Sequence, residues 1–182
     1  MTHQFEDQNS LKLFELLGQM LGQFTSMDNQ ERAAAEDQFH QHWLVNQTDV
    51  TFAGLAHLAA RHPSEEIRSM AAVLLRRKGL KFVTDDKGAG DVPYFATLGE
   101  EVRGYIHSQL LLALTNENVP SIRNKICDTT AELAAYMCSM GDLFCNEEDS
   151  SSLAILNAGI QDPDESVRLA ALRAGSAFLV NA

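Results

Sequence analysis

The chain has 182 residues, of which 45% are hydrophobic and 7% aromatic, and its formal net charge is -11. An aliphatic composition with 4 prolines favours helices over sheets. The acidic balance argues against direct nucleic-acid binding, which needs a basic face. It suits either a partner rich in Lys and Arg or simple solubility.

The sequence also limits where the protein works. Its first residues lack the basic start and apolar run of a signal peptide. No stretch reaches the ~18 apolar residues that a membrane helix needs. The 3 cysteines fit no zinc spacing and are consistent with a reducing compartment. We therefore expect an intracellular, soluble protein.

A helix-start signal followed by an arginine recurs along the chain, at Arg32, Arg68, Arg123 and Arg168. These arginines lie 36, 55 and 45 residues apart, from 32 to 68, 68 to 123 and 123 to 168. HEAT and armadillo repeats run about 40–47 residues. The long interval contains an insertion, Val83–Val92, whose Gly and Asp residues predict a loop.

Apolar residues at helical spacing mark an arginine-bearing helix and a preceding partner helix in each repeat. The partner helices carry Phe14, Leu17, Leu21 and Phe24; Phe52, Leu55, Ala56 and Ala59; Ile106, Leu110, Ala113 and Leu114; and Leu153, Leu156 and Ile160. The later arginine-bearing helices carry Ile67, Ala71, Leu74 and Leu75; Ile122, Ile126, Leu133 and Met137; and Val167, Ala171, Ala174 and Phe178. Asp162 before Pro163 predicts the N-cap and a first-turn proline of the last helix.

The pattern predicts an all-α protein, an α-solenoid of about four HEAT-type helical hairpins in a right-handed superhelical stack. Each hairpin would consist of an outer helix A and an inner helix B. Because one hairpin cannot bury its apolar face alone, neighbouring hairpins must stack. We expect residues 1–182 to form one solenoid segment. The last helix lacks a polar capping repeat, which predicts a fragment of a longer protein.

Two segments resemble the N-terminal domain of the importin-β (karyopherin-β) superfamily, which would cover about residues 28–100. Residues Ala34 to Phe39 form an Ala-Glu-x-x-hydrophobic start. Residues Ile67 to Arg77 form an Arg-x-x-Ala-x-x-Leu-Leu helix that ends in basic residues. Residues Met70–Arg77 and Lys125–Ala134 are most similar to the karyopherin beta-3 branch of that superfamily.

The resemblance implies a nuclear transport receptor rather than an enzyme, with no cofactor. Members bind cargo in the cytoplasm and release it when Ran-GTP binds in the nucleus. The implied locations are therefore the cytoplasm, the nucleus and the nuclear pore. The implied partners are Ran-GTP, basic protein cargo and Phe-Gly nucleoporins, without direct contact to nucleic acid or membrane.

In that family, Ran contacts the B helices of the first repeats. The resemblance therefore implies a surface for a Ran-type GTPase at Arg32, Glu36, Arg76, Arg77, Lys78, Arg123, Asp128 and Glu132. Each of these has a structural alternative. Arginines that recur once per repeat are better explained as a ladder, each bridging to an acid of the next hairpin. The basic residues at 76–78 would offset a helix dipole, and the acids at 128 and 132, one turn apart, would face solvent.

Other functions remain open at this point. The same hairpins would serve a HEAT scaffold of a phosphatase or chromatin complex, since fold does not determine function. A HEAT-type metalloenzyme would need His-Glu pairs, and none of the 6 histidines precedes a glutamate. Trp43 and Cys127 are expected to be packing residues of the core.

Overall fold

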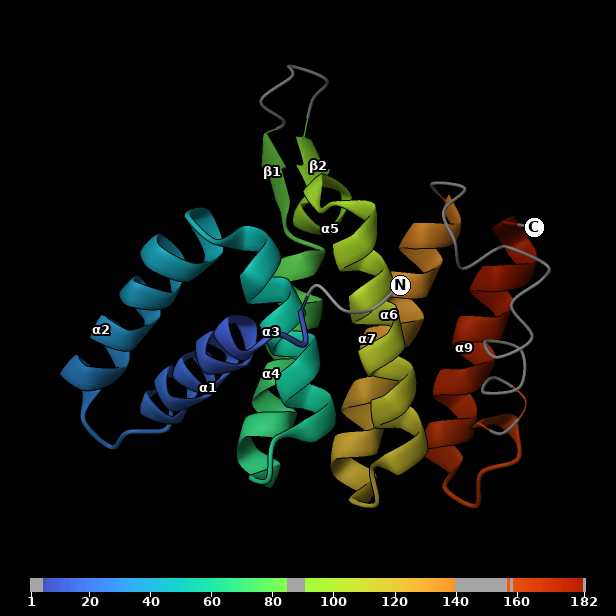
Figure 1. Cartoon of the computed structure of the whole chain (residues 1–182). Coiled ribbons are helices and arrows are strands. Elements are labelled where there is room, and N and C mark those ends of the chain that lie inside the picture. Colours follow the sequence, from blue (N-terminus) through green and yellow to red (C-terminus); the bar gives the residue numbers. More distant parts are fainter. Residues whose placement is uncertain (1–4, 85–90, 140–156, 158, 182) are drawn as a thin grey trace.

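The computed structural model describes residues 5–84, 91–139, 157 and 159–181. These residues form helical hairpins that stack side by side in two rows (Figure 1). The A row consists of α1 (Gln8–Gln23), α3 (Thr48–Arg61) and α6 (Glu100–Asn116). The B row consists of α2 (Asn29–Gln38) with its continuation η1 (Phe39–Val45), α4 (Glu65–Gly79), α7 (Pro120–Ser139) and α9 (Glu165–Asn181). Within the rows, α3 packs between α1 and α6, and α7 packs between α4 and α9.

Aspartate side chains cap the N-terminal ends of the helices α1 and α2. The Asp7 carboxylate accepts a hydrogen bond from the Ser10 amide at 2.7 Å, which caps α1. Asp28 caps α2 in the same way through the Gln30 amide at 2.7 Å. Each cap satisfies an amide that has no partner inside its helix. The hairpin boundaries are therefore encoded locally.

The predicted apolar stripes form the core. In the first three A helices every predicted residue is buried except Phe24 and Leu114, which are half-buried. In the B helices the buried members are Ile67, Ala71, Leu75, Ile122, Ile126, Leu133, Val167 and Ala171. This packing confirms the predicted α-solenoid. Leu153 and Leu156, and the side chains of Met137, Ala174 and Phe178, lie outside the described residues.

The prediction that Ile160 lies in the core is wrong, because its side chain is 41% exposed. Ile160 stands two residues before Asp162, just as Thr115 stands two residues before Glu117. Thr115 is exposed as well. Thr115 falls beside the buried stripe of α6, in the last turn before the chain reverses, and Ile160 holds the equivalent position before Asp162.

The two ends of the insertion at 83–92 form strands where its composition predicts a loop, while residues 85–90 lie outside the described residues. These ends belong to a two-stranded antiparallel ribbon, β1 (Phe82–Thr84) and β2 (Asp91–Pro93), with Val83 opposite Val92. The β-branched residues at these ends favour extended backbone. After β2, the short helix α5 (Tyr94–Thr97) buries Phe95 in the core. The ribbon projects beyond the end of the helical stack (Figure 1).

The first B helix ends differently from the others. Its continuation η1 is a π-helix, and it turns Phe39, Trp43 and Leu44 into the core. The Phe39 ring meets Phe24 of the first A helix edge-on, with centroids 5.8 Å apart. The prediction that Trp43 is a packing residue is confirmed. Within the described ranges, no helix is long and apolar enough to cross a membrane.

Candidate interaction surfaces of the B helices

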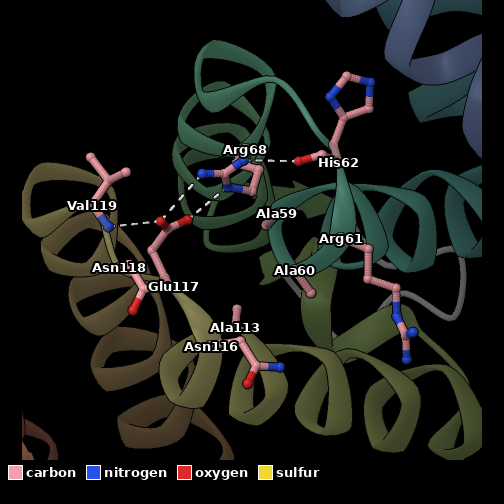
Figure 2. A pocket seen from close by; sticks show the side chains of 10 residues that line it. All are labelled: Ala59, Ala60, Arg61, His62, Arg68, Ala113, Asn116, Glu117, Asn118 and Val119. Atoms are coloured by element: carbon pink, nitrogen blue, oxygen red, sulfur yellow. Dashed lines mark hydrogen bonds and ion pairs between the residues drawn. The ribbon is translucent and has the colours of Figure 1, made fainter.

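Hairpin 2 (α3 and α4) is joined to hairpin 3 (α6 and α7) by an ion pair between half-buried Arg68 and buried Glu117. The Arg68 Nε atom lies 2.7 Å from Glu117 Oε2, and Nη2 donates to Oε1 at 3.3 Å. Arg68 Nη1 also donates to the carbonyls of His62 and Pro63, while Glu117 accepts from the Val119 amide at 2.9 Å. Figure 2 shows the two side chains pointing toward each other at one wall of a cavity of about 300 Å³. We name this pair the first rung.

The pKa values of the first rung follow from its surroundings. The hydrogen bond to Glu117 raises the pKa of Arg68 above its usual value. Burial by itself would raise the pKa of Glu117, but the hydrogen bonds from Arg68 and from the Val119 amide outweigh it and lower that pKa. Both groups are therefore charged at neutral pH, and a partly buried pair of this kind is costly to break from one side.

A second rung joins hairpin 3 to the turn before the helix α9. Arg123 Nη1 lies 3.4 Å from Asp162 Oδ2, and Arg123 Nη2 lies 3.4 Å from Oδ1. Arg168 repeats the local contacts of Arg68, since its Nη1 donates to the carbonyls of Asp162 and Pro163 at 2.8 Å. The predicted arginine ladder is thus confirmed at Arg68 and Arg123.

This rung corrects the prediction that Asp162 caps the last helix. The helix α9 begins at Glu165, and its first turn closes from the Arg168 amide to the Asp164 carbonyl. The Asp162 carboxylate instead accepts from the Asp164 amide at 2.9 Å and binds Arg123. It orders the turn before the helix, so the helix starts two residues later than predicted.

Arg32 departs from the ladder. Its Nη1 atom donates to the Ser26 carbonyl at 2.8 Å, and its Nη2 atom donates to the Asn29 side chain. Both contacts are local to the turn between α1 and α2. Within the described residues, Arg32 forms no ion pair with hairpin 2. The ladder therefore begins one hairpin later than the arginine repeat does.

A more exposed charge network crosses the B row. Arg76 on α4 lies 3.4 Å from both Asp128 Oδ2 and Glu132 Oε1 on α7. Arg173 on α9 approaches Asp128 Oδ1 at 4.0 Å. The prediction that Asp128 and Glu132 share a helix face is confirmed, since both reach the same guanidinium. We name these four residues the B-row network.

The basic end of α4 lies beside this network. Arg77 is exposed and Lys78 half-buried. Burial, followed by the charges of Lys81 and Arg77, lowers the pKa of Lys78, while Glu36 on α2 opposes that shift. Of the eight residues predicted for the GTPase surface, the structure brings together Arg76 with Asp128 and Glu132.

The acids of the ladder were not predicted from the sequence, although a signal for them exists. Glu117 and Asp162 each stand six residues before an arginine of the repeat, Arg123 and Arg168. The corresponding positions before Arg68 and Arg32 hold His62 and Ser26. A scan for an acid at this spacing would have predicted two rungs and the absence of one at Arg32. Arg173 carries no comparable signal in the sequence.

The stacked hairpins joined by a repeating ion pair define a class of protein, the HEAT-repeat α-solenoids. No family model matches the chain. The chain is 31% identical over 115 residues to importin subunit beta-3 of Saccharomyces cerevisiae, which covers 63% of this chain and 11% of that protein. Two crystal structures of Kap121p match 93% of this chain and 18% of their own chains. The complex with RanGTP is 25% identical with a TM-score of 0.58. The complex with Pho4p is 24% identical with a TM-score of 0.60.

The chain is similar to members of the importin-β superfamily, the family that the segments at 34–39 and 67–77 predicted. It spans about a tenth of the length of the curated relative and under a fifth of the length of the Kap121p chains.

Proposed function

We propose that this chain is part of an importin-β-type nuclear transport receptor and that its B row contributes to binding a Ran-type GTPase in the GTP state. The observation that carries the proposal is the match of 93% of the chain to Kap121p, one structure of which is bound to RanGTP. The chain acts by binding and not by catalysis. The protein that contains it works in the cytoplasm and the nucleus and passes through the nuclear pore.

The proposed GTPase surface divides into three parts. Glu36, Arg77 and Lys78 offer charges that no ion pair neutralises among the described residues. Arg76, Asp128 and Glu132 belong to the B-row network. Arg32 and Arg123 lie at the turns of the hairpins, where local carbonyls and Asp162 already hold them. Arg77 is the most informative of these residues, since its replacement disturbs no ion pair.

A partner that binds at the B-row network would change how neighbouring hairpins pack. Asp128 lies between a cation of α4 and a cation of α9. A partner that engages Asp128 competes with Arg76 and Arg173 for the same carboxylate. Such competition loosens the contact between neighbouring hairpins, and it favours whichever arrangement of hairpins the partner binds more tightly.

The other partners follow from the same similarity to the importin-β superfamily. We propose basic protein cargo and Phe-Gly nucleoporins, bound by the longer receptor. Kap121p structures bound to Pho4p and to Nup53p support this extension.

A binding titration tests the GTPase proposal. Purified chain is titrated with Ran loaded with a non-hydrolysable GTP analogue and, separately, with GDP. We expect tighter binding of the GTP form and about tenfold weaker binding for Arg77→Glu, which reverses an exposed charge. Lys12→Glu, which reverses an exposed cation on α1 of the A row, is the matched control. Equal affinity for the two nucleotide forms contradicts the proposal.

A further inference from the structure

Basic residues cluster at and just after the end of α4, although the chain as a whole is acidic. Four of the 14 lysines and arginines lie between positions 76 and 81, although the formal net charge is -11. Asp128 and Glu132 engage Arg76. In the part of the chain that the structure describes, Arg77, Lys78 and Lys81 have no ion-pair partner. Within the described ranges, no ion pair therefore offsets these three neighbouring cations.

An exposed aromatic side chain adjoins these cations. Phe82, the first residue of β1, is 62% exposed. Its backbone is held in place, because Phe82 pairs with Pro93 across the ribbon and the Tyr94 amide donates to the Lys81 carbonyl at 3.0 Å. The fold thus holds a large apolar group in water directly after a lysine.

After burial, the neighbouring cations Lys81 and Arg77 contribute to the lowered pKa of Lys78. The charge of Glu36 compensates only in part. A carboxylate placed beside these cations would offset the repulsion between them.

We propose that Arg77, Lys78, Lys81 and Phe82 form a docking surface for an acidic peptide segment of a partner protein that also carries an aromatic or aliphatic side chain. We name it the basic-aromatic patch. The carboxylates of the segment pair with the three cations, and its apolar side chain covers Phe82. The patch includes two residues, Lys81 and Phe82, outside the GTPase surface, and it does not depend on the GTPase being a partner.

The charge of the whole chain favours a short acidic peptide over other anions. A nucleic acid carries dense negative charge along its length and is repelled by a chain with a net charge of -11. Stable attachment to a membrane surface needs more buried apolar area than one exposed aromatic residue provides. A short peptide contacts the patch alone and avoids the surrounding acids.

Fluorescence anisotropy with a short labelled peptide of alternating acidic residues and phenylalanines tests the proposal. We expect wild-type chain to bind and Lys81→Glu to bind about tenfold more weakly, since one ion pair is replaced by a repulsion. Phe82→Ser is expected to weaken binding about threefold without changing its salt dependence, because no charge is altered. The matched control Lys12→Glu keeps wild-type affinity.

Three results would overturn the proposal: no binding of the peptide by wild-type chain, an equal loss in Lys12→Glu, or tighter binding of an RNA oligonucleotide or an anionic vesicle that depends on Lys81 and Phe82. The same variants are then titrated with the GTP-loaded GTPase. If the peptide binds through the patch while the GTPase does not bind at all, the docking surface stands and the proposed function fails. If the GTPase binds while the peptide does not, the docking surface fails and the proposed function stands.

Discussion

The first hairpin and the two that follow it share the same sequence pattern. They differ in how many residues they bury and in the contacts of their arginines. The helix α2 buries one residue, Ala35, whereas α4 buries five and α3 is buried over most of its length. Arg32 bonds within its own turn, while Arg68 and Arg123 reach the next hairpin. A hairpin of this stack is therefore stabilised mainly by the neighbours on its two sides, and α2 has little of that support.

The largest expected effect is the loss of a buried side chain between hairpins. Leu75 on α4 is fully buried. Leu75→Ala should lower the free energy of unfolding by about 2–5 kcal/mol, because it leaves a cavity between packed helices. Leu16→Ala on the exposed side of α1 should change it by less than about 0.5 kcal/mol. Chemical denaturation measures both, and similar values for the two variants would place Leu75 outside the core.

The ladder provides the next comparison. Arg68→Ala should cost roughly 2–3 kcal/mol, because the buried charge of Glu117 loses its partner. Arg32→Ala should cost less than about 1 kcal/mol, since it removes contacts within one exposed turn. Denaturation curves of the two variants measure the difference. A larger loss for Arg32→Ala would show that the first hairpin depends on its arginine as much as the second does.

The close approach of α1 to α3 is the third comparison. A Cβ atom at Gly54 would lie 2.8 Å from Leu17 and 2.9 Å from Phe14, so Gly54→Ala should cost about 1–3 kcal/mol by overpacking. At Gly104 in α6 nothing lies within 4 Å of such an atom. Gly104→Ala should therefore stabilise the chain by about 0.5–1 kcal/mol through helix propensity. Stabilisation by both substitutions would show that α1 does not pack closely against α3 at Gly54.

The last comparison concerns pH. His57 on α3 shares a hydrogen bond of 2.9 Å with the Tyr105 hydroxyl on α6. Burial, reinforced by the charge of Arg61, lowers the pKa of His57 from 6.5 to about 4. The unfolded chain takes up a proton at this site before the folded chain does, so stability falls as the pH drops from 6.5 toward 4. Thermal melts of wild type and His57→Gln across this range should converge at low pH, and a constant difference would contradict the shift.

The predictable part of the fold is the part that depends on helical periodicity. The stripe Phe52, Leu55, Ala56 and Ala59 is wholly buried, as the spacing predicts. Periodicity does not reveal how many neighbours a helix has, so it treats the alanines of α2 like those of α4, although Ala33 and Ala34 are exposed. The ribbon β1–β2 and the π-helix η1 were not predicted, because each depends on pairing or packing with distant segments.

The sequence likewise predicts only some of the contacts at the interaction surfaces. Spacing predicts that Asp128 and Glu132 share a face and that the repeated arginines form a ladder. It does not reveal that Arg76 and Arg173 both approach Asp128, because that contact requires the relative position of three helices. The exposure of Phe82 likewise depends on the ribbon that holds it.

Native-state hydrogen exchange tests the central claim most directly, because it measures the opening free energy of each helix in the intact chain. We predict that the amides of α3 and α4 exchange at the rate of global unfolding, while those of α2 exchange far faster through local opening. Equal protection of α2 and α4 would contradict the claim that each hairpin owes its stability to the neighbours on both sides.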